Sequence, residues 1–262
     1  MADADALLRK GDVVGARAAL TDIVRSRPGD PKPRMFLFQL LALVGEWDKS
    51  RKALQTLAQL EPEAQMLAAA YNQAIAGEEL RASVFAGQAE MPLLANADGW
   101  AAGVAGGIAL LARGDEAGAI AARDAAFDAA PDMPGRLNGE PFEWIADADS
   151  RFGPTLEVIV AGRYGLLPFD AVARIISEGP RDLRDLVWYP VEITLRSGQS
   201  VAGFVPARYP GSEASADPAE QLARVTGWHD TQWGQRGSGQ RLWVRSDGAD
   251  CGILGLRSLE FG

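Results

Sequence analysis

The chain has 262 residues, of which 47% are hydrophobic and 23% charged, a balance typical of a folded protein with a sizeable core. Its formal net charge of −9 argues against nucleic acid and anionic membrane surfaces as partners, because an acidic surface repels phosphate groups. With one cysteine, Cys251, and one histidine, His229, the sequence excludes an internal disulfide and an HExxH-type site, and we expect no metal and no cofactor.

The first residues, MADADALLRKGD, are acidic and lack the basic start and the apolar run of a secretory signal. No apolar stretch approaches the ~20 residues that a transmembrane helix needs. We therefore expect a cytoplasmic protein without membrane insertion.

Three segments of the first half align without gaps: residues 11–28, 45–62 and 114–131. In each, a glycine precedes an acidic residue, and a proline closes the segment 17 positions after the glycine. A small residue stands five positions after each glycine: Ala16, Ser50 and Ala119. The segments are offset by 34 and 69 residues, and a period near 34 is typical of tetratricopeptide helix pairs. The pattern predicts a glycine turn inside each pair and a proline after its second helix.

The helix expected before the second of these glycines is unusually apolar over residues 35–44, which indicates packing on more than one side. Residues 64–86 are predicted as a further helix-pair element, residues 87–99 as a linker, and residues 100–113 as a helix rich in alanine and glycine. The first helices of tetratricopeptide pairs line a concave face that binds helices or extended peptides. We predict that this face carries the partner contacts. The candidate residues are Arg34, Phe38, Gln39 and Tyr71.

A stretch rich in glycine and proline, DMPGRLNGEP, indicates a boundary between a helical domain, residues 1–134, and a β-rich domain, residues 135–262. We expect the helical domain to bind the partner by itself. Beyond the boundary, short β-like runs alternate with turn signals. The expected strands are residues 156–161, 173–176, 188–196, 199–205, 241–245 and 253–259, with a two-residue turn at Ser197 and Gly198 and a short helix at residues 218–226. The predicted fold class is α+β: a tetratricopeptide-like α-helical repeat domain followed by a small antiparallel, barrel-like domain.

The densest polar cluster is EPFEWIADADSR, residues 140–151. If this segment is a helix, Glu143 and Asp147 share one face with Asp149 nearby, and such carboxylates bind a hard cation or act as acid and base. This gives one candidate function, a metal-dependent hydrolase. The alternative, which we favour, is structural: the acids cap a helix and pair with Arg151 or Arg163.

In the structural interpretation the same segment docks onto the β-rich domain through apolar anchors. These are Phe142, Trp144 and Ile145. We expect Trp144 to be buried, and its replacement by alanine to destabilise the fold by roughly 3 kcal/mol or more.

A second charged cluster, DLRDLVW, contains Asp182, Arg184 and Asp185 and ends at Trp188. It is interpreted either as a partner surface or as a salt-bridged rim, and we favour the rim, because exposed ion pairs are common and weak. The segment RYPGSE, residues 208–213, has the glycine and serine of a phosphate loop but lacks its GK[ST] ending. His229 is expected at the surface, since no nucleophile pairs with it in the sequence.

Several of these segments resemble one family. PFEWIADADSRFGPTLEVIVAGRYGLLPF (residues 141–169), DLRDLVWYP (182–190) and ARYPGSE (207–213) resemble the ImpE/TagJ family of type VI secretion accessory proteins, as does FLFQLL (36–41) followed by GEW. The resemblance implies a cytosolic, non-enzymatic adaptor. It also implies binding to a helix of the small sheath subunit TssB and, through it, a link to the ATPase ClpV. It assigns no individual binding residue.

Overall fold

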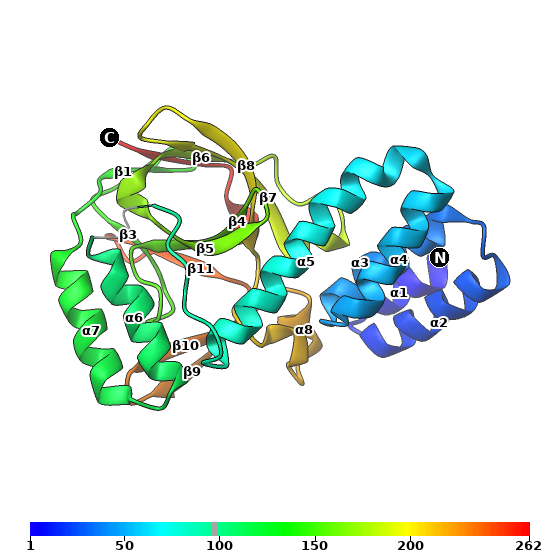
Figure 1. Ribbon diagram of the computed structural model, residues 1–262, viewed down its shortest axis with the longest axis horizontal. Helices are drawn as coiled ribbons and strands as arrows, with labels where there is room; N and C mark the ends of the chain where they lie inside the picture. The colour runs from blue at the N-terminus through cyan, green and yellow to red at the C-terminus, as the bar shows by residue number, and fades with distance from the viewer. Residues whose placement is uncertain (96–98) are drawn as a thin grey trace.

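The structure, a computed structural model, describes residues 1–95 and 99–262, and helices make up most of its first half (Figure 1). The α-helices that precede the first strand in this described part are α1 (Ala2–Arg9), α2 (Val13–Ser26), α3 (Pro31–Leu43), α4 (Trp47–Leu60), α5 (Gln65–Phe85), α6 (Ala101–Ala112) and α7 (Glu116–Ala129). The predicted tetratricopeptide-like helices are therefore confirmed. Within residues 1–95 and 99–262, no helix is long and apolar enough to cross a membrane.

The repeated glycines lie between the two helices of each pair. Gly11, Gly45 and Gly114 have φ angles of 84°, 70° and 84°, a left-handed conformation that glycine adopts without a side-chain clash. Directly after two of these glycines, Asp12 and Asp115 accept a hydrogen bond from the amide three positions on and cap the following helix. The small residue five positions after each glycine is buried, so the paired helices approach closely there.

The helices do not form one continuous array (Figure 1). α1–α4 lie at one end of the molecule, α6 and α7 lie beside the β-rich part at the other end, and α5 crosses between them. The prediction of a helix-pair element at residues 64–86 is wrong, because Gln65–Phe85 is a single helix. Its internal glycine, Gly77, makes no turn: a Cβ there would lie 2.7 Å from Ile159 Cδ1, so this glycine lets α5 approach the sheet. Of the predicted linker, residues 96–98 lie outside the described part of the chain.

Antiparallel strands make up the second half, as predicted. They are β1 (Gly135–Leu137), β2 (Glu140–Phe142), β3 (Ile145–Asp147), β4 (Thr155–Val160), β5 (Arg163–Pro168), β6 (Val172–Ile176), β7 (Trp188–Leu195), β8 (Ser200–Pro206), β9 (Thr226–Thr231), β10 (Gly234–Gly239), β11 (Leu242–Arg245), β12 (Asp250–Gly252) and β13 (Ser258–Phe261). One sheet has the order β2-β1-β13-β6-β7-β8-β4-β5, a second has the order β12-β11-β3, and β9 and β10 form a hairpin. The predicted turn between β7 and β8 is confirmed, with Gly198 at a φ of 86°.

Two predictions near the end of the chain are partly wrong. The helix α8 (Pro218–Gln221) is shorter than predicted, and Thr226 already begins the hairpin of β9 and β10. A 3₁₀ turn, Ile253–Gly255, replaces the first part of the last predicted strand. The sequence did not predict β9 and β10, because these segments contain several glycines and glycine disfavours strands. In the structure one of them is required, since a Cβ on Gly237 would lie 2.3 Å from the Tyr209 ring.

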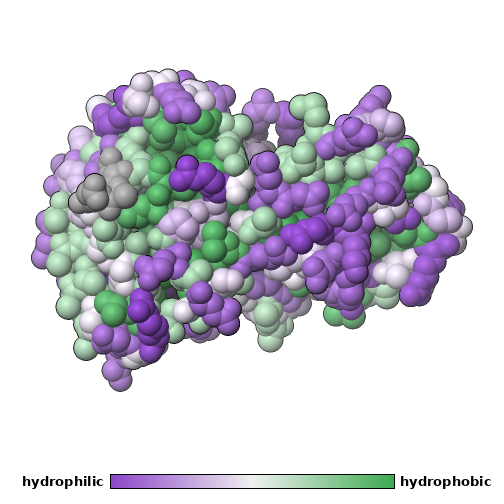
Figure 2. Space-filling model, viewed as in Figure 1, coloured by the Kyte–Doolittle hydropathy of each residue, from purple (hydrophilic) through white to green (hydrophobic). Residues whose placement is uncertain are grey.

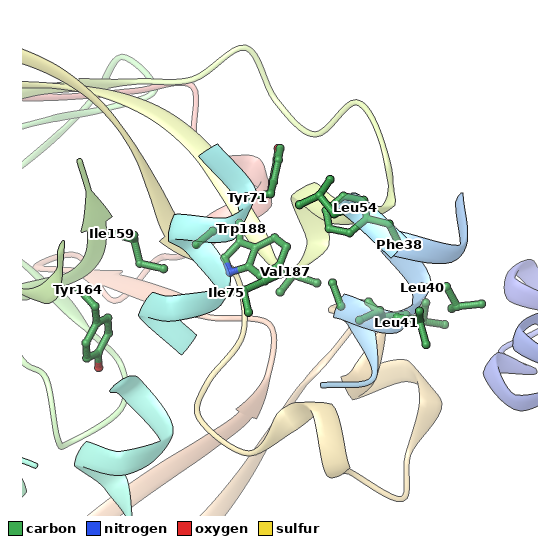
Figure 3. Packing of buried hydrophobic residues seen from close by; sticks show 14 of the residues in the cluster. Phe38, Leu40, Leu41, Leu54, Tyr71, Ile75, Ile159, Tyr164, Val187 and Trp188 are labelled. Carbon is green, nitrogen blue, oxygen red and sulfur yellow. The ribbon is translucent and has the colours of Figure 1, made fainter. Parts of the chain in front are cut away.

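The helical and β-rich parts share one hydrophobic core. Phe38 of α3 lies with its ring 5.7 Å from that of Tyr71 of α5, and the Tyr71 ring lies 5.5 Å from Trp188 and 5.2 Å from Phe204 of the sheet. Figure 3 shows Phe38, Tyr71 and Trp188 between α3, α5 and the segment that leads into β7. Trp188 is fully buried, so it joins the two parts rather than filling either one alone.

Trp144 contradicts the expectation of an aromatic anchor. It stands between β2 and β3 and is 41% exposed, whereas its neighbours Phe142 and Ile145 are buried. The segment is extended rather than helical, and it turns the Trp144 side chain away from the core that the other two residues fill. The large destabilisation expected for Trp144→Ala is therefore withdrawn.

We predict instead that Trp188→Ala lowers the free energy of unfolding by about 3–5 kcal/mol, because it removes a large buried aromatic from the shared core. Trp144→Ala is the matched control, and we expect it to change stability by no more than about 1 kcal/mol. Urea unfolding followed by circular dichroism measures both. Equal effects of the two substitutions would contradict the assignment of Trp188 to the junction.

Candidate functional site

The acidic segment at residues 140–151 is not a helix. It consists of β2, β3 and a turn, and β3 pairs with β11. Glu143 is exposed, whereas Asp147 and Asp149 are buried, so the predicted shared helix face of Glu143 and Asp147 does not exist. In the described part of the chain, no group of three or more histidine, cysteine, aspartate or glutamate side chains is arranged to hold a metal ion.

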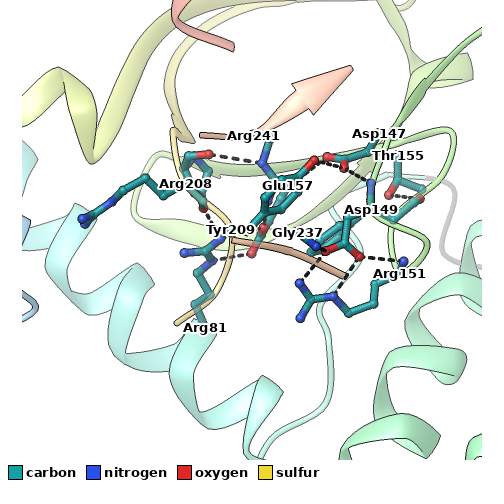
Figure 4. Close-up of polar contacts among 12 residues, drawn as sticks. Arg81, Asp147, Asp149, Arg151, Thr155, Glu157, Arg208, Tyr209, Gly237 and Arg241 are labelled. Atoms are coloured by element: carbon teal, nitrogen blue, oxygen red, sulfur yellow. Dashed lines mark hydrogen bonds and ion pairs between the residues drawn. The ribbon is translucent and has the colours of Figure 1, made fainter. Parts of the chain in front are cut away.

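Asp147 and Asp149 are instead bound by arginines and by main-chain amides (Figure 4). Arg151 donates to both carboxylate oxygens of Asp149, from Nε at 2.9 Å and from Nη2 at 2.6 Å, and the Gly237 amide donates to the same carboxylate at 2.8 Å. Asp147 forms an ion pair with Arg241 and accepts a hydrogen bond from the Tyr209 hydroxyl at 2.9 Å. Asp149 pairs with Arg151, as the structural interpretation expects. Asp147 pairs with Arg241 instead, and neither acid caps a helix, because the segment is extended.

The network continues to Glu157 of β4, which is fully buried. Arg81 of α5 donates to both of its carboxylate oxygens, at 2.6 and 3.0 Å, and Arg241 forms a second ion pair with it. The Tyr164 hydroxyl also donates to Glu157. One carboxylate of the sheet therefore binds a helix of the first half and the start of β11 in the second half.

The protonation equilibria follow from this geometry. Burial alone would raise the pKa of Glu157, but the charges of Arg81 and Arg241 outweigh it and lower that pKa to about 2. Asp147 has one guanidinium, which it shares with Glu157. Burial therefore prevails over Arg241 and raises the pKa of Asp147 to about 6.

The sequence analysis missed Glu157, Arg81 and Arg241. A signal for Glu157 was present: it is the single charge in the run LEVIVA, and an ionised side chain in an apolar strand needs a buried partner. No such signal marks Arg81, because arginine is common on helices and its partner lies 76 residues away.

The second charged cluster lies against the first helices. Leu183–Leu186 form a 3₁₀ turn that packs on α3, with Asp182 and Asp185 capping the turn. Arg184 pairs with Asp182 at 2.8 Å, and its guanidinium lies 4.9 Å from the centre of the Tyr71 ring. These contacts favour the salt-bridged interpretation for the charged residues of this cluster. They also cover part of the concave face with the protein's own chain.

The placement of Phe38 and Tyr71 on an open face is wrong, because Phe38 has no exposed surface and Tyr71 is buried. Gln39 is largely buried, but it lines both depressions that remain open on this face. Arg34 is half-buried and donates to the Pro28 carbonyl oxygen. The physical reason is that α3 is enclosed by α2, by α4 and by the turn at Leu183–Leu186. The helix α3 is apolar on several faces because each of these faces packs against another part of the chain.

Part of this face remains open, in two adjoining depressions of about 460 and 390 Å³. Both are lined by Phe36, which is half-buried. We call them together the first-helix groove. Its apolar lining is Leu8, Met35, Phe36, Leu183, Leu186 and Leu222. The groove is thus formed by residues of both halves of the chain.

Comparisons with known proteins agree with this architecture. The family model described as ImpE protein matches residues 139–260, and a tetratricopeptide repeat model matches residues 7–73. The type VI secretion system accessory component TagJ of Pseudomonas aeruginosa is 42% identical over 258 residues, which cover 98% of this chain and 90% of TagJ. The crystal structure of protein VPA1032 from Vibrio parahaemolyticus superposes with a TM-score of 0.88 at 20% identity, over 99% of this chain and 97% of that one, and shows a shared fold.

We predict that Glu157→Gln lowers the free energy of unfolding by about 3–5 kcal/mol at neutral pH, because it leaves Arg81 and Arg241 buried without their shared anion. The wild type should also lose stability as the pH falls from 4.5 towards about 2, since the pKa of Glu157 is lower in the folded state than its ordinary value of 4.5. The variant should lack this acid-dependent component. Urea unfolding across that pH range measures both effects.

The control is Glu116→Gln, which removes an exposed carboxylate that forms no ion pair within the described part of the chain. If Glu157→Gln loses as much unfolding free energy as the wild type when the pH falls from 4.5 to about 2, the central role of this carboxylate is contradicted.

Proposed function

The chain belongs to the ImpE/TagJ family of type VI secretion accessory proteins, and on that premise we propose that it is a non-enzymatic, cytoplasmic adaptor. In this proposal it binds a helix of the small sheath subunit TssB and is connected through it to ClpV-dependent recycling of the sheath. The observation that carries the proposal is the tetratricopeptide-like helical region together with a groove that remains open on its first helices.

The first-helix groove has the apolar lining expected for a helix-in-groove contact. Its two depressions share Phe36, and aliphatic side chains line them with this ring. An amphipathic helix presents apolar residues at intervals of three and four, which suits a row of adjoining depressions. Charged residues also line the two depressions. Arg9 pairs with Asp5 and Arg224 donates to the Leu8 carbonyl oxygen, whereas the exposed Lys32 is left to contact the polar flank of such a helix.

The composite lining changes the expectation for the isolated helical domain. Leu183, Leu186 and Leu222 belong to the second half of the chain, so residues 1–134 alone would offer an incomplete groove. We therefore propose that partner binding requires the full chain.

We predict that the full chain and the TssB sheath subunit elute as a stoichiometric complex from a sizing column. Phe36→Ala should weaken this complex about tenfold, because an aromatic at the centre of such a contact contributes about 1–2 kcal/mol. Isothermal titration calorimetry measures the change.

Met66→Ala is the matched control, since Met66 is 86% exposed and lies outside the groove. No complex at tens of micromolar would contradict the adaptor function. A complex that Phe36→Ala and Met66→Ala weaken equally would leave the function standing and place the interface elsewhere.

A further inference from the structure

A second concave site lies on the other side of the junction between the two halves. It is a cleft of about 480 Å³ between α5, the adjoining ends of α6 and α7, the turn at residues 210–213 and the hairpin of β9 and β10. Its apolar walls include Trp47, Phe85, Leu111 and Trp233. Arg81 and Arg151 of the buried network and the exposed Arg236 also line the cleft. The network uses the two former arginines for Glu157 and Asp149, and the first-helix groove shares none of the cleft's residues.

One corner of the cleft carries two carboxylates with too few cations. Glu78 is buried, and its one ion pair is a 3.3 Å contact to Nη1 of Arg81, whose other nitrogens already bind Glu157. The Glu213 carboxylate forms no hydrogen bond or ion pair within the described part of the chain. Burial raises the pKa of Glu78, and although Arg81 opposes this shift, the charge of Glu213 adds to it. The corner is therefore short of positive charge.

Arg208 is the next cation, but it does not satisfy either carboxylate directly. Its guanidinium donates to the main-chain oxygens of Leu43 at 2.8 Å and Gln221 at 2.6 Å, and it forms no ion pair among residues 1–95 and 99–262. Burial lowers its pKa to about 10. Its charge acts on Glu78 and Glu213 through space, and their oxygens stay available to a further donor.

An aromatic ring completes the corner. Trp47 and Glu213 meet at Gly45: a Cβ on this glycine would lie 2.8 Å from Glu213 Cγ and 3.9 Å from Trp47 Cζ2. Trp47 is half-buried and lines the cleft together with Glu78. A tryptophan ring beside two carboxylates is the arrangement that binds a guanidinium or ammonium group, through a cation–π contact and charge-assisted hydrogen bonds.

We propose that this corner, formed by Trp47, Glu78 and Glu213, binds the cationic head of an arginine or lysine side chain of a partner polypeptide. The rest of the cleft favours a polypeptide over a free cation. From Glu78 to Phe85 it follows two turns of α5, about 10 Å at 1.5 Å per residue. The apolar walls along this length accommodate the aliphatic stem of the basic residue and its neighbours in the partner.

The test uses the full chain and the peptide acetyl-Leu-Arg-Leu-amide, with a second peptide in which neutral citrulline replaces arginine. We expect the arginine peptide to bind at least about tenfold more tightly than the citrulline peptide. Glu213→Gln should remove most of this difference. Glu63→Gln, which removes an exposed carboxylate outside the cleft, should leave it unchanged. Calorimetry gives the affinities, and the thermal midpoint of each variant confirms that it is folded.

A third arm distinguishes the source of the cation. Free L-arginine should bind more weakly than the peptide, and equal affinities would overturn the assignment to a polypeptide. Equal binding of the two peptides, no binding of either, or an unchanged preference in Glu213→Gln would overturn the site itself. No arm contains the sheath subunit, so failure here is separate from failure of the adaptor function.

Discussion

The carboxylate of Glu157 is the interaction on which the arrangement of the two halves depends. It lies in the sheet with no exposed surface, and its charge is balanced by Arg81 from α5 and by Arg241 from the start of β11. An isolated ion at such a depth is destabilised by several kcal/mol, so each member of the group is tolerable only while the others are in place. Displacing α5 from the sheet would leave Glu157 with Arg241 alone and Arg81 with Glu78 alone.

This constraint explains why the helical region is not a free-standing solenoid. α5 is fixed to the sheet by Arg81 and by the close approach at Gly77, and it separates α1–α4 from α6 and α7 (Figure 1). Trp188 then closes the shared core between α5 and the sheet. The helix pairs keep the local geometry of their repeat, while their mutual placement follows the sheet.

Both candidate binding surfaces are products of that placement. The first-helix groove combines α1 and α3 with Leu183, Leu186 and Leu222, and the cleft combines α5 and α6 with the turn at residues 210–213. In Figure 2 hydrophilic residues cover much of the helical part at the right, and hydrophobic residues gather mainly at the left, over the β-rich part. The shape of both surfaces therefore depends on the two halves being joined.

The sequence by itself determined the local features: the helix pairs, their glycine turns, the change to antiparallel strands and the family. The helix pairs, turns and strands follow from spacing within a few tens of residues, as with Gly11 and Ala16 or the turn at Gly198. The family follows from the resemblance of several segments along the chain. The sequence failed where distant contacts decide the outcome. Phe38 and Trp144 are both large and apolar, and their own neighbours in the chain do not show that one is enclosed and the other exposed. Glu157 and Arg81, 76 residues apart, meet only when α5 lies on the sheet. Burial and ion pairing are properties of surroundings, and those surroundings exist only in the tertiary structure.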